Sequence, residues 1–112
     1  MGVSVGEGVE TGLVAVDGRL DLRASAEVRL QAAAAIAAAG GSLVLDLSTV
    51  EFIDSSGLGV LAGLHREATR LGGRLAIVVP EGSARQIFTL TRTEGFFCLV
   101  PTREAARAAL AS

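Results

Sequence analysis

The sequence is poor in cysteine, proline and aromatic residues, and it carries no excess of positive charge. The single cysteine, Cys98, excludes an internal disulfide and a cysteine-cluster metal site, and its apolar neighbours predict a buried thiol. Ten Lys and Arg against twelve Asp and Glu give a formal net charge of −2. The chain therefore lacks the basic field that neutralises nucleic-acid phosphates, and we expect no nucleic-acid partner.

Long hydrophobic runs are also missing. The longest unbroken apolar run, Ala32 to Ala39, is well short of the roughly 20 residues that span a bilayer. No basic segment followed by an apolar stretch stands near Met1, so no secretory signal is visible. These absences predict a cytoplasmic protein without direct membrane insertion.

The hydrophobic pattern predicts one small α/β domain over residues 1–112. Short apolar segments bounded by Gly or Pro predict strands at 12–16, 43–47, 74–79 and 97–100, and a weak edge strand plus turn at 2–8. Helical spacing predicts helices at 25–39, 57–71 and 83–90, and a terminal helix opened by 101–102. Strands that alternate with helices form a mostly parallel sheet, here flanked by about four helices.

Three local details of this fold follow from residue chemistry. The Asp17-Gly18 pair predicts a turn after strand 12–16, because both residues tolerate positive φ. Ser25 predicts the N-cap of the first helix. The strand–helix–strand order predicts that 43–47 and 74–79 are adjacent and parallel.

No pattern of residues in the sequence supports an active site. The only histidine, His65, stands midway along the second predicted helix beside Arg66, which predicts a surface position. The sequence has no Gly-x-Ser-x-Gly elbow, no Gly-x-Gly-x-x-Gly loop with a ribose-binding acid and no Walker-type Gly-Lys-Ser/Thr. We therefore expect no catalytic residue, no cofactor and no bound metal, and hence a protein that is not an enzyme.

The segment 46–59 is the most distinctive part of the chain. It runs from the end of a buried-type strand, through a predicted loop anchored by Val50, Phe52 and Ile53, to the start of a helix.

Polar residues and glycines crowd the start of that helix. Asp54, Ser55 and Ser56 are all good N-cap types, and capping alone is one complete explanation for them. One cap suffices for a helix, however, and Gly57 and Gly59 each weaken a helix by up to about 1 kcal/mol relative to Ala. A first turn without side chains suits a docking partner or a kinase active site, so the second explanation is an interaction site.

The run Asp54-Ser55-Ser56-Gly57-Leu58-Gly59 resembles the signature of the STAS domain, and it is similar to that of bacterial anti-sigma factor antagonists. Weaker matches are spread from about Gly12 to Leu110, namely Gly18-Arg19-Leu20-Asp21, Leu45-Asp46-Leu47, Gly72-Gly73-Arg74-Leu75 and Glu104-Ala105. One departure is Thr91-Arg92-Thr93, where family members often carry Thr/Ser-Gly-Leu.

This resemblance implies a function by partner switching. It implies that Ser55 is phosphorylated by an anti-sigma factor that is also a serine kinase, with a phosphatase to reverse it. The unphosphorylated form would bind the anti-sigma factor and free a sigma factor for transcription, as a monomer or weak dimer. The partner-binding residues that the resemblance implies are Asp21, Asp54, Ser56, Gly57, Leu58, Gly59 and Val60.

Other functions share the same element. A STAS subunit of a lipid- or anion-transport assembly would use it for docking, and so would a STAS scaffold in a sensory complex. The paired Ser55-Ser56 favours a phosphoacceptor over both, and an enzyme such as a small hydrolase is the third alternative.

Overall fold

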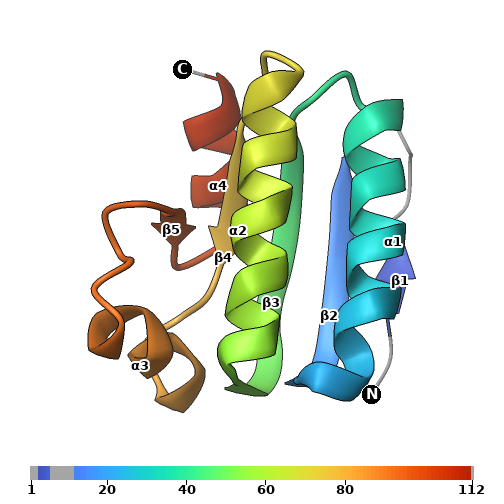
Figure 1. Cartoon of the computed structure of the whole chain (residues 1–112). Helices are drawn as coiled ribbons and strands as arrows, with labels where there is room; N and C mark the ends of the chain where they lie inside the picture. The colour runs from blue at the N-terminus through green and yellow to red at the C-terminus, as the bar shows by residue number, and fades with distance from the viewer. Residues whose placement is uncertain (1–2, 6–11, 112) are drawn as a thin grey trace.

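A computed structural model describes residues 3–5 and 12–111 of the chain. Within these residues, five strands form one sheet in the order β1-β2-β3-β4-β5, with β2 to β5 parallel and β1 antiparallel to β2 (Figure 1). The strands are β1 (Val3–Val5), β2 (Leu13–Leu20), β3 (Leu43–Ile53), β4 (Leu75–Val78) and β5 (Cys98–Val100). The helices are α1 (Leu22–Ala38), α2 (Ser55–Arg70), α3 (Ser83–Leu90) and α4 (Arg103–Ala111). The predicted α/β, mostly parallel architecture is confirmed, and the turn expected after the edge strand lies outside the described residues.

The helices form a layer on each side of the sheet. Helices α1 and α2 lie side by side over one face, and α4 packs behind β4 and β5 (Figure 1). The core under α1 and α2 is aliphatic and includes the fully buried Val28, Ile36, Leu45, Leu61 and Ile77. A smaller cluster surrounds Ala106 of α4 on the opposite face. The core therefore holds α1 and α2 at fixed positions on the sheet.

Strands β3 and β4 are adjacent and parallel, as the sequence predicts, with Leu45 opposite Ile77. The glycine pairs that precede them have a packing function. A Cβ atom on Gly73 would lie 2.3 Å from the carbonyl carbon of Gly41, so the loops after α2 and α1 touch backbone to backbone. Only glycine allows that approach.

Strand β3 continues to Ile53, so the loop predicted after Leu47 is wrong. Two stretches of β3 carry one residue more than the matching stretch of β2, as the pairs Ala15↔Asp46, Asp17↔Thr49, Gly18↔Val50 and Arg19↔Phe52 show. Each extra residue is a β-bulge. Residues 48–49 and 51–52 are consequently exposed in consecutive pairs, and the period-two pattern that marks a strand is lost.

The Asp17-Gly18 pair lies within β2 and forms no turn after it, so that prediction is also wrong. Gly18 does adopt a positive φ of 81°, where the register with β3 shifts. Thr49 Oγ1 donates hydrogen bonds to Asp17 Oδ1 and, at 3.1 Å, to the carbonyl oxygen of Val16. Asp17 and Gly18 thus lie at an irregularity within β2, where the register with β3 shifts.

Helix α1 begins at Leu22, and its N-cap is Asp21. The Oδ1 atom of Asp21 accepts hydrogen bonds from the backbone N–H groups of Arg23 and Ala24, at 3.1 and 3.2 Å. The expected cap Ser25 lies in the first turn, where its hydroxyl donates to the Asp21 carbonyl oxygen at 2.7 Å. The predicted start of this helix was therefore one turn too late.

Candidate functional site

Helices α1 and α2 begin at the same edge of the sheet, where β2 and β3 end (Figure 1). Leu20 pairs with Ile53 across the two strands, and the backbone N–H of Asp54 donates to the Leu20 carbonyl oxygen at 3.3 Å. Asp21 and Asp54 follow directly, each as the N-cap of its helix. The topology thus brings two of the predicted site residues to one edge, which is where ligands commonly bind in parallel sheets.

Asp54 alone supplies the side-chain cap of α2. Its Oδ1 atom accepts a hydrogen bond from the Gly57 N–H at 2.9 Å, and its carbonyl oxygen accepts the Leu58 N–H at 2.9 Å. Ser55, the first residue of α2, is exposed, and Ser56 is half-buried. The Ser55 hydroxyl is therefore accessible at a helix start that Asp54 already caps.

The two glycines of this turn have different surroundings. Gly57 is buried, and a Cβ there would lie 2.3 Å from the Leu20 carbonyl oxygen. Gly57 therefore lets α2 approach β2, and the expectation that it opens the backbone to a partner is corrected. Gly59 is exposed, and beyond its chain neighbours and the backbone of its own helix no atom of the described residues lies within 4 Å of its would-be Cβ. Leu58 and Val60 are half-buried beside it, so apolar surface flanks open backbone.

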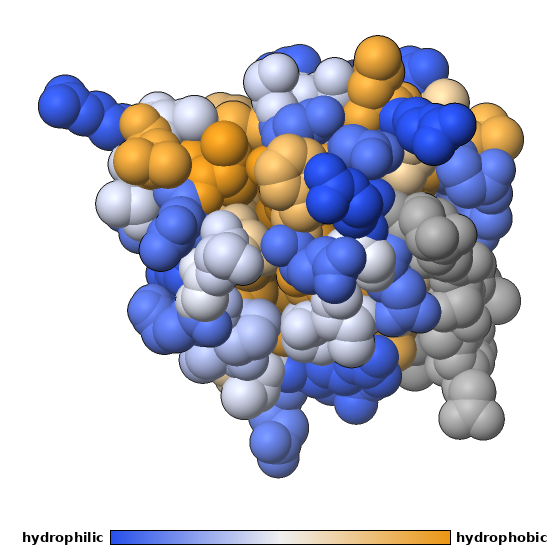
Figure 2. All heavy atoms as spheres, turned by 90° about the horizontal axis from the view of Figure 1, so that it is seen from below, coloured by the Kyte–Doolittle hydropathy of each residue, from blue (hydrophilic) through white to orange (hydrophobic). Residues whose placement is uncertain are grey.

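An open apolar groove of about 440 Å³ runs from Ser55 to the segment that follows α3. Its lining residues are Ser55, Leu58, Gly59, Ala62, Thr93, Phe96 and Phe97. Figure 2 shows this end of the molecule, with apolar surface gathered in the upper left among hydrophilic side chains. Sequence reasoning missed Thr93 and Phe96, and the only local signal was the adjacent pair Phe96-Phe97.

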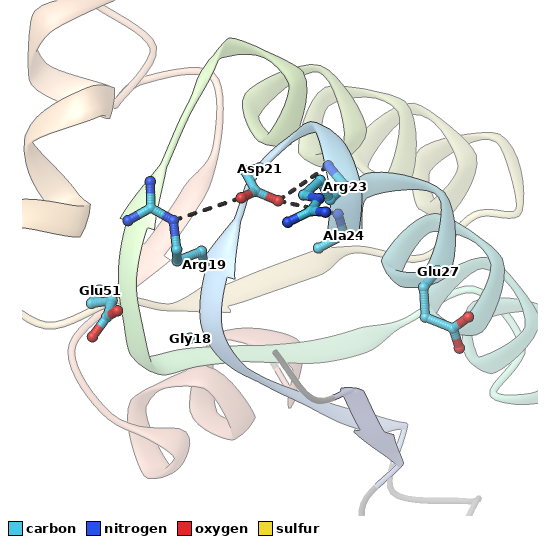
Figure 3. Close-up of a pocket in the computed structure, with 7 residues that line it drawn as sticks. All are labelled: Gly18, Arg19, Asp21, Arg23, Ala24, Glu27 and Glu51. Carbon is cyan, nitrogen blue, oxygen red and sulfur yellow. Dashed lines mark hydrogen bonds and ion pairs between the residues drawn. The ribbon is translucent and has the colours of Figure 1, made fainter.

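A second open pocket, of about 690 Å³, surrounds Asp21 (Figure 3). It is lined by Gly18, Arg19, Asp21, Arg23, Ala24, Glu27 and Glu51. The Nε atom of Arg19 lies 3.6 Å from Asp21 Oδ2, and its guanidinium carbon lies 4.2 Å from the centre of the Phe52 ring. Arg19 is thus held between a carboxylate and an aromatic ring, a role that the sequence did not reveal.

His65 and Cys98 both differ from expectation. His65 is half-buried, with its ring centre 4.5 Å from that of Phe96, so it is less exposed than a residue of the open surface. Its buried Nδ1 atom has no hydrogen-bond partner among the described residues. Cys98 is half-buried in β5 and not fully buried. A second residue, Phe97, also faces the His65 ring, at 6.1 Å between centres.

In residues 3–5 and 12–111, no helix has both the length and the apolar character needed to cross a membrane. In the same residues, no three His, Cys, Asp or Glu side chains gather in a way that could hold a metal ion.

The fold and the exposed serine at the start of α2 define a STAS domain, and the family model of that name, "STAS domain", matches residues 4–107. The curated anti-sigma F factor antagonist of Lysinibacillus sphaericus is 31% identical over 80 residues, which are 70% of this chain and 68% of that protein. The chain belongs to the STAS domain family of bacterial anti-sigma factor antagonists.

Solved structures agree with this assignment. An anti-sigma factor antagonist from Mycobacterium paratuberculosis superposes with a TM-score of 0.81 at 28% identity, over 99% of this chain and 94% of that chain. The antagonist SpoIIAA in its unphosphorylated form superposes with a TM-score of 0.72 at 25% identity, over 88% of this chain and 86% of that chain. SpoIIAA from Bacillus in its phosphorylated form superposes with a TM-score of 0.69 at 24% identity, over 96% of this chain and 98% of that chain. At this identity the likeness supports the fold alone.

Proposed function

We propose that this antagonist binds an anti-sigma factor that is also a serine kinase, and that phosphorylation of Ser55 ends the binding. The observation that carries the proposal is the position of Ser55, exposed at the first residue of α2 beside the half-buried apolar Leu58 and Val60. The SpoIIAA structure at 25% identity is that of an unphosphorylated form, and this supports a phosphoacceptor in the family.

The partner surface in this proposal lies along the edge where α1 and α2 begin. Asp54 and Ser56 flank the phosphoacceptor, and Asp21 caps the neighbouring helix. The apolar contact is made by Leu58, the open backbone at Gly59 and Val60. Gly57 is buried against Leu20 and holds this turn of α2 on the end of β2.

Phosphorylation would change the interface more than the fold. A phosphate on Ser55 adds about −1.5 to −2 charges at the start of α2. The helix dipole favours that charge by about 0.3–1 kcal/mol, while the neighbouring Asp54 carboxylate opposes it by a similar amount. A partner packed over Leu58 would have to desolvate the new charge, which costs several kcal/mol. The domain stays folded and the partner leaves.

The resulting activity is regulation of transcription without catalysis by this chain. The unphosphorylated protein sequesters the anti-sigma factor in the cytoplasm and so frees a sigma factor. A phosphatase that removes the Ser55 phosphate resets the switch. The protein acts as a monomer or weak dimer and uses no cofactor.

The test is phosphorylation followed by binding. The protein is incubated with each purified anti-sigma factor of its source genome and ATP, and the phosphate is mapped by mass spectrometry. We expect one phosphate, on Ser55 and not on Ser56. Ser55→Ala should bind the same anti-sigma factor but escape release, and Ser55→Asp should bind at least tenfold more weakly. Ser56→Ala is the matched control and should behave as wild type.

Two results would contradict the proposal. The first is a phosphate that maps to another residue. The second is a Ser55→Asp variant that binds as tightly as wild type. If no anti-sigma factor phosphorylates or binds the protein, Ser55 is only part of a docking surface, and the transport-subunit hypothesis takes precedence.

A further inference from the structure

We infer that the anti-sigma factor inserts an apolar side chain into the groove between α2 and the segment 91–97, with Phe96 as the anchor. This groove, called the Phe96 groove below, is the one lined by Ser55, Leu58, Gly59, Ala62, Thr93, Phe96 and Phe97. The inference rests on the proposed function and adds to it a second contact region, in the segment that follows α3.

The segment 91–97 is held firmly against the end of α3. The Thr93 N–H donates to the Phe88 carbonyl oxygen at 2.9 Å, and the Thr91 hydroxyl donates to the Ile87 carbonyl oxygen at 2.7 Å. The Phe96 N–H in turn donates to the Thr93 carbonyl oxygen at 3.0 Å. A wall fixed in this way needs little ordering when a partner binds, which favours affinity.

Phe96 combines a fixed ring with an open face. Its ring centre lies 4.5 Å from that of His65 and 4.9 Å from that of Phe97. Despite these contacts, 46% of the residue remains exposed. Aromatic side chains that are rigid yet open are typical anchors of protein interfaces. Across the groove, Gly59 offers no side chain, so an incoming group can reach the helix backbone.

The position of Ser55 identifies the occupant as the kinase itself. Ser55 lines the groove, so a protein that brings ATP to the Ser55 hydroxyl also covers the mouth of the groove. A phosphate added to Ser55 would then stand at the rim of an apolar contact. Desolvating it there is unfavourable, and this couples phosphorylation to release of the inserted side chain.

Gly59→Gln tests the groove without damaging the fold. The new Cβ meets no described atom within 4 Å, and Gln is a better helix former than Gly, so the melting temperature should not fall. The longer side chain would occupy the groove. Gly63→Gln is the matched control, because Gly63 lies one turn further along α2, also has room for a Cβ atom and is not a lining residue.

Each variant is titrated by calorimetry against the anti-sigma factor that phosphorylates Ser55, with ADP in place of ATP. We expect Gly59→Gln to weaken binding at least tenfold and Gly63→Gln to stay within twofold of wild type. Phe96→Ala should also weaken binding at least tenfold, and Phe96→Leu should restore part of the loss.

The outcomes separate this inference from the proposed function. If wild type binds, Ser55→Asp does not, and both Gly59→Gln and Phe96→Ala stay within twofold of wild type, the groove is not used and the inference fails alone. The inference fails also if Gly63→Gln loses as much affinity as Gly59→Gln. The partner would then contact the exposed face of α2 in general and not the Phe96 groove in particular. If no anti-sigma factor binds wild type, both proposals fall.

Discussion

A Cβ atom on Gly57 would lie 2.3 Å from the carbonyl oxygen of Leu20 and 2.8 Å from its Cγ atom. No side chain can be accommodated at that distance unless α2 moves away from the sheet. The first turn of α2 is therefore seated directly on the end of β2. This contact fixes Asp54 and Ser55 relative to Asp21, the residue after Leu20, and so holds the two helix starts in one site.

Gly57→Ala should destabilise the protein although Ala is the better helix former. We expect a loss of about 1–3 kcal/mol in the free energy of unfolding, because the methyl group collides with the Leu20 backbone. Gly59→Ala, in open space on the same turn, should instead gain up to about 1 kcal/mol. Urea unfolding of both variants is the measurement, and equal effects at the two positions would show that the contact is not tight.

Much of the fold could be predicted from local pattern. The apolar runs at 43–47 and 74–79 and the glycine pairs after α1 and α2 are short-range signals, and they gave the parallel pair β3–β4 correctly. The helix 83–90 was predicted with the bounds that the structure has. These elements follow the ordinary periods of strands and helices, which a single sequence displays.

The remaining features depend on contacts between distant segments. The end of β3 was missed because its two bulges break the alternation of buried and exposed residues. The burial of Gly57 depends on Leu20, and the wall of the groove depends on Phe96, which reaches α2 only through packing. Capping chemistry alone does not show whether Asp21 or Ser25 is the N-cap of α1, since both are favourable cap residues.

Arg92 is the one non-glycine residue of the described segments with a positive φ, at 58°. This left-handed conformation costs a residue with a side chain about 1–2 kcal/mol, and glycine adopts it without that cost. Arg92→Gly should therefore raise the free energy of unfolding by up to about 1 kcal/mol, while Arg92→Ala keeps the strain and should give no gain. Thermal unfolding compares the three proteins, and a melting temperature lower for the glycine variant than for the alanine variant would contradict this.

Asp46 is a buried carboxylate in β3, 4% exposed, that pairs with Arg103 Nε at the start of α4. Burial acts to raise its pKa, but hydrogen bonds from Ser48 and the ion pair with Arg103 together outweigh burial and lower the pKa below the ordinary 3.8. Because the folded pKa is depressed, the ionised carboxylate stabilises the fold above its unfolded pKa. That stability is lost as the pH falls through the lower, folded pKa.

Arg103→Gln should reveal this linkage. At pH 7 the variant leaves the buried Asp46 carboxylate without its cation, and we expect a loss of about 1–3 kcal/mol in the free energy of unfolding. As the pH falls through the lowered pKa of Asp46, the carboxylate becomes protonated and the difference from wild type should shrink. The exposed Arg107 of the same helix gives the matched control, Arg107→Gln. Urea unfolding at a series of pH values from 7 down into the acid range measures both variants, and a difference that stays constant over the whole series would rule out Asp46 as its source.

Asp21 offers a way to remove a charge from the proposed partner surface while keeping the helix cap. Its Oδ1 atom caps α1, and its Oδ2 atom faces Arg19 and the open pocket of Figure 3. Asn caps a helix about as well as Asp, and the exposed ion pair with Arg19 contributes at most about 1 kcal/mol. The free energy of unfolding of Asp21→Asn should therefore lie within about 1 kcal/mol of the wild-type value.

Asp21→Asn should change the affinity for the anti-sigma factor more than it changes the stability of the fold. If the Oδ2 carboxylate oxygen meets a cation of the partner, Asp21→Asn should weaken binding at least tenfold, equivalent to about 1.4 kcal/mol. Glu67→Gln removes the same charge from the far end of α2, where Glu67 pairs with Arg70, and should leave the dissociation constant within twofold of wild type. Calorimetric titration of the two variants decides the matter. Equal dissociation constants for Asp21→Asn and Glu67→Gln would show that the Asp21 side chain serves only as the N-cap of α1. The partner surface would then be confined to α2 and the groove beside it.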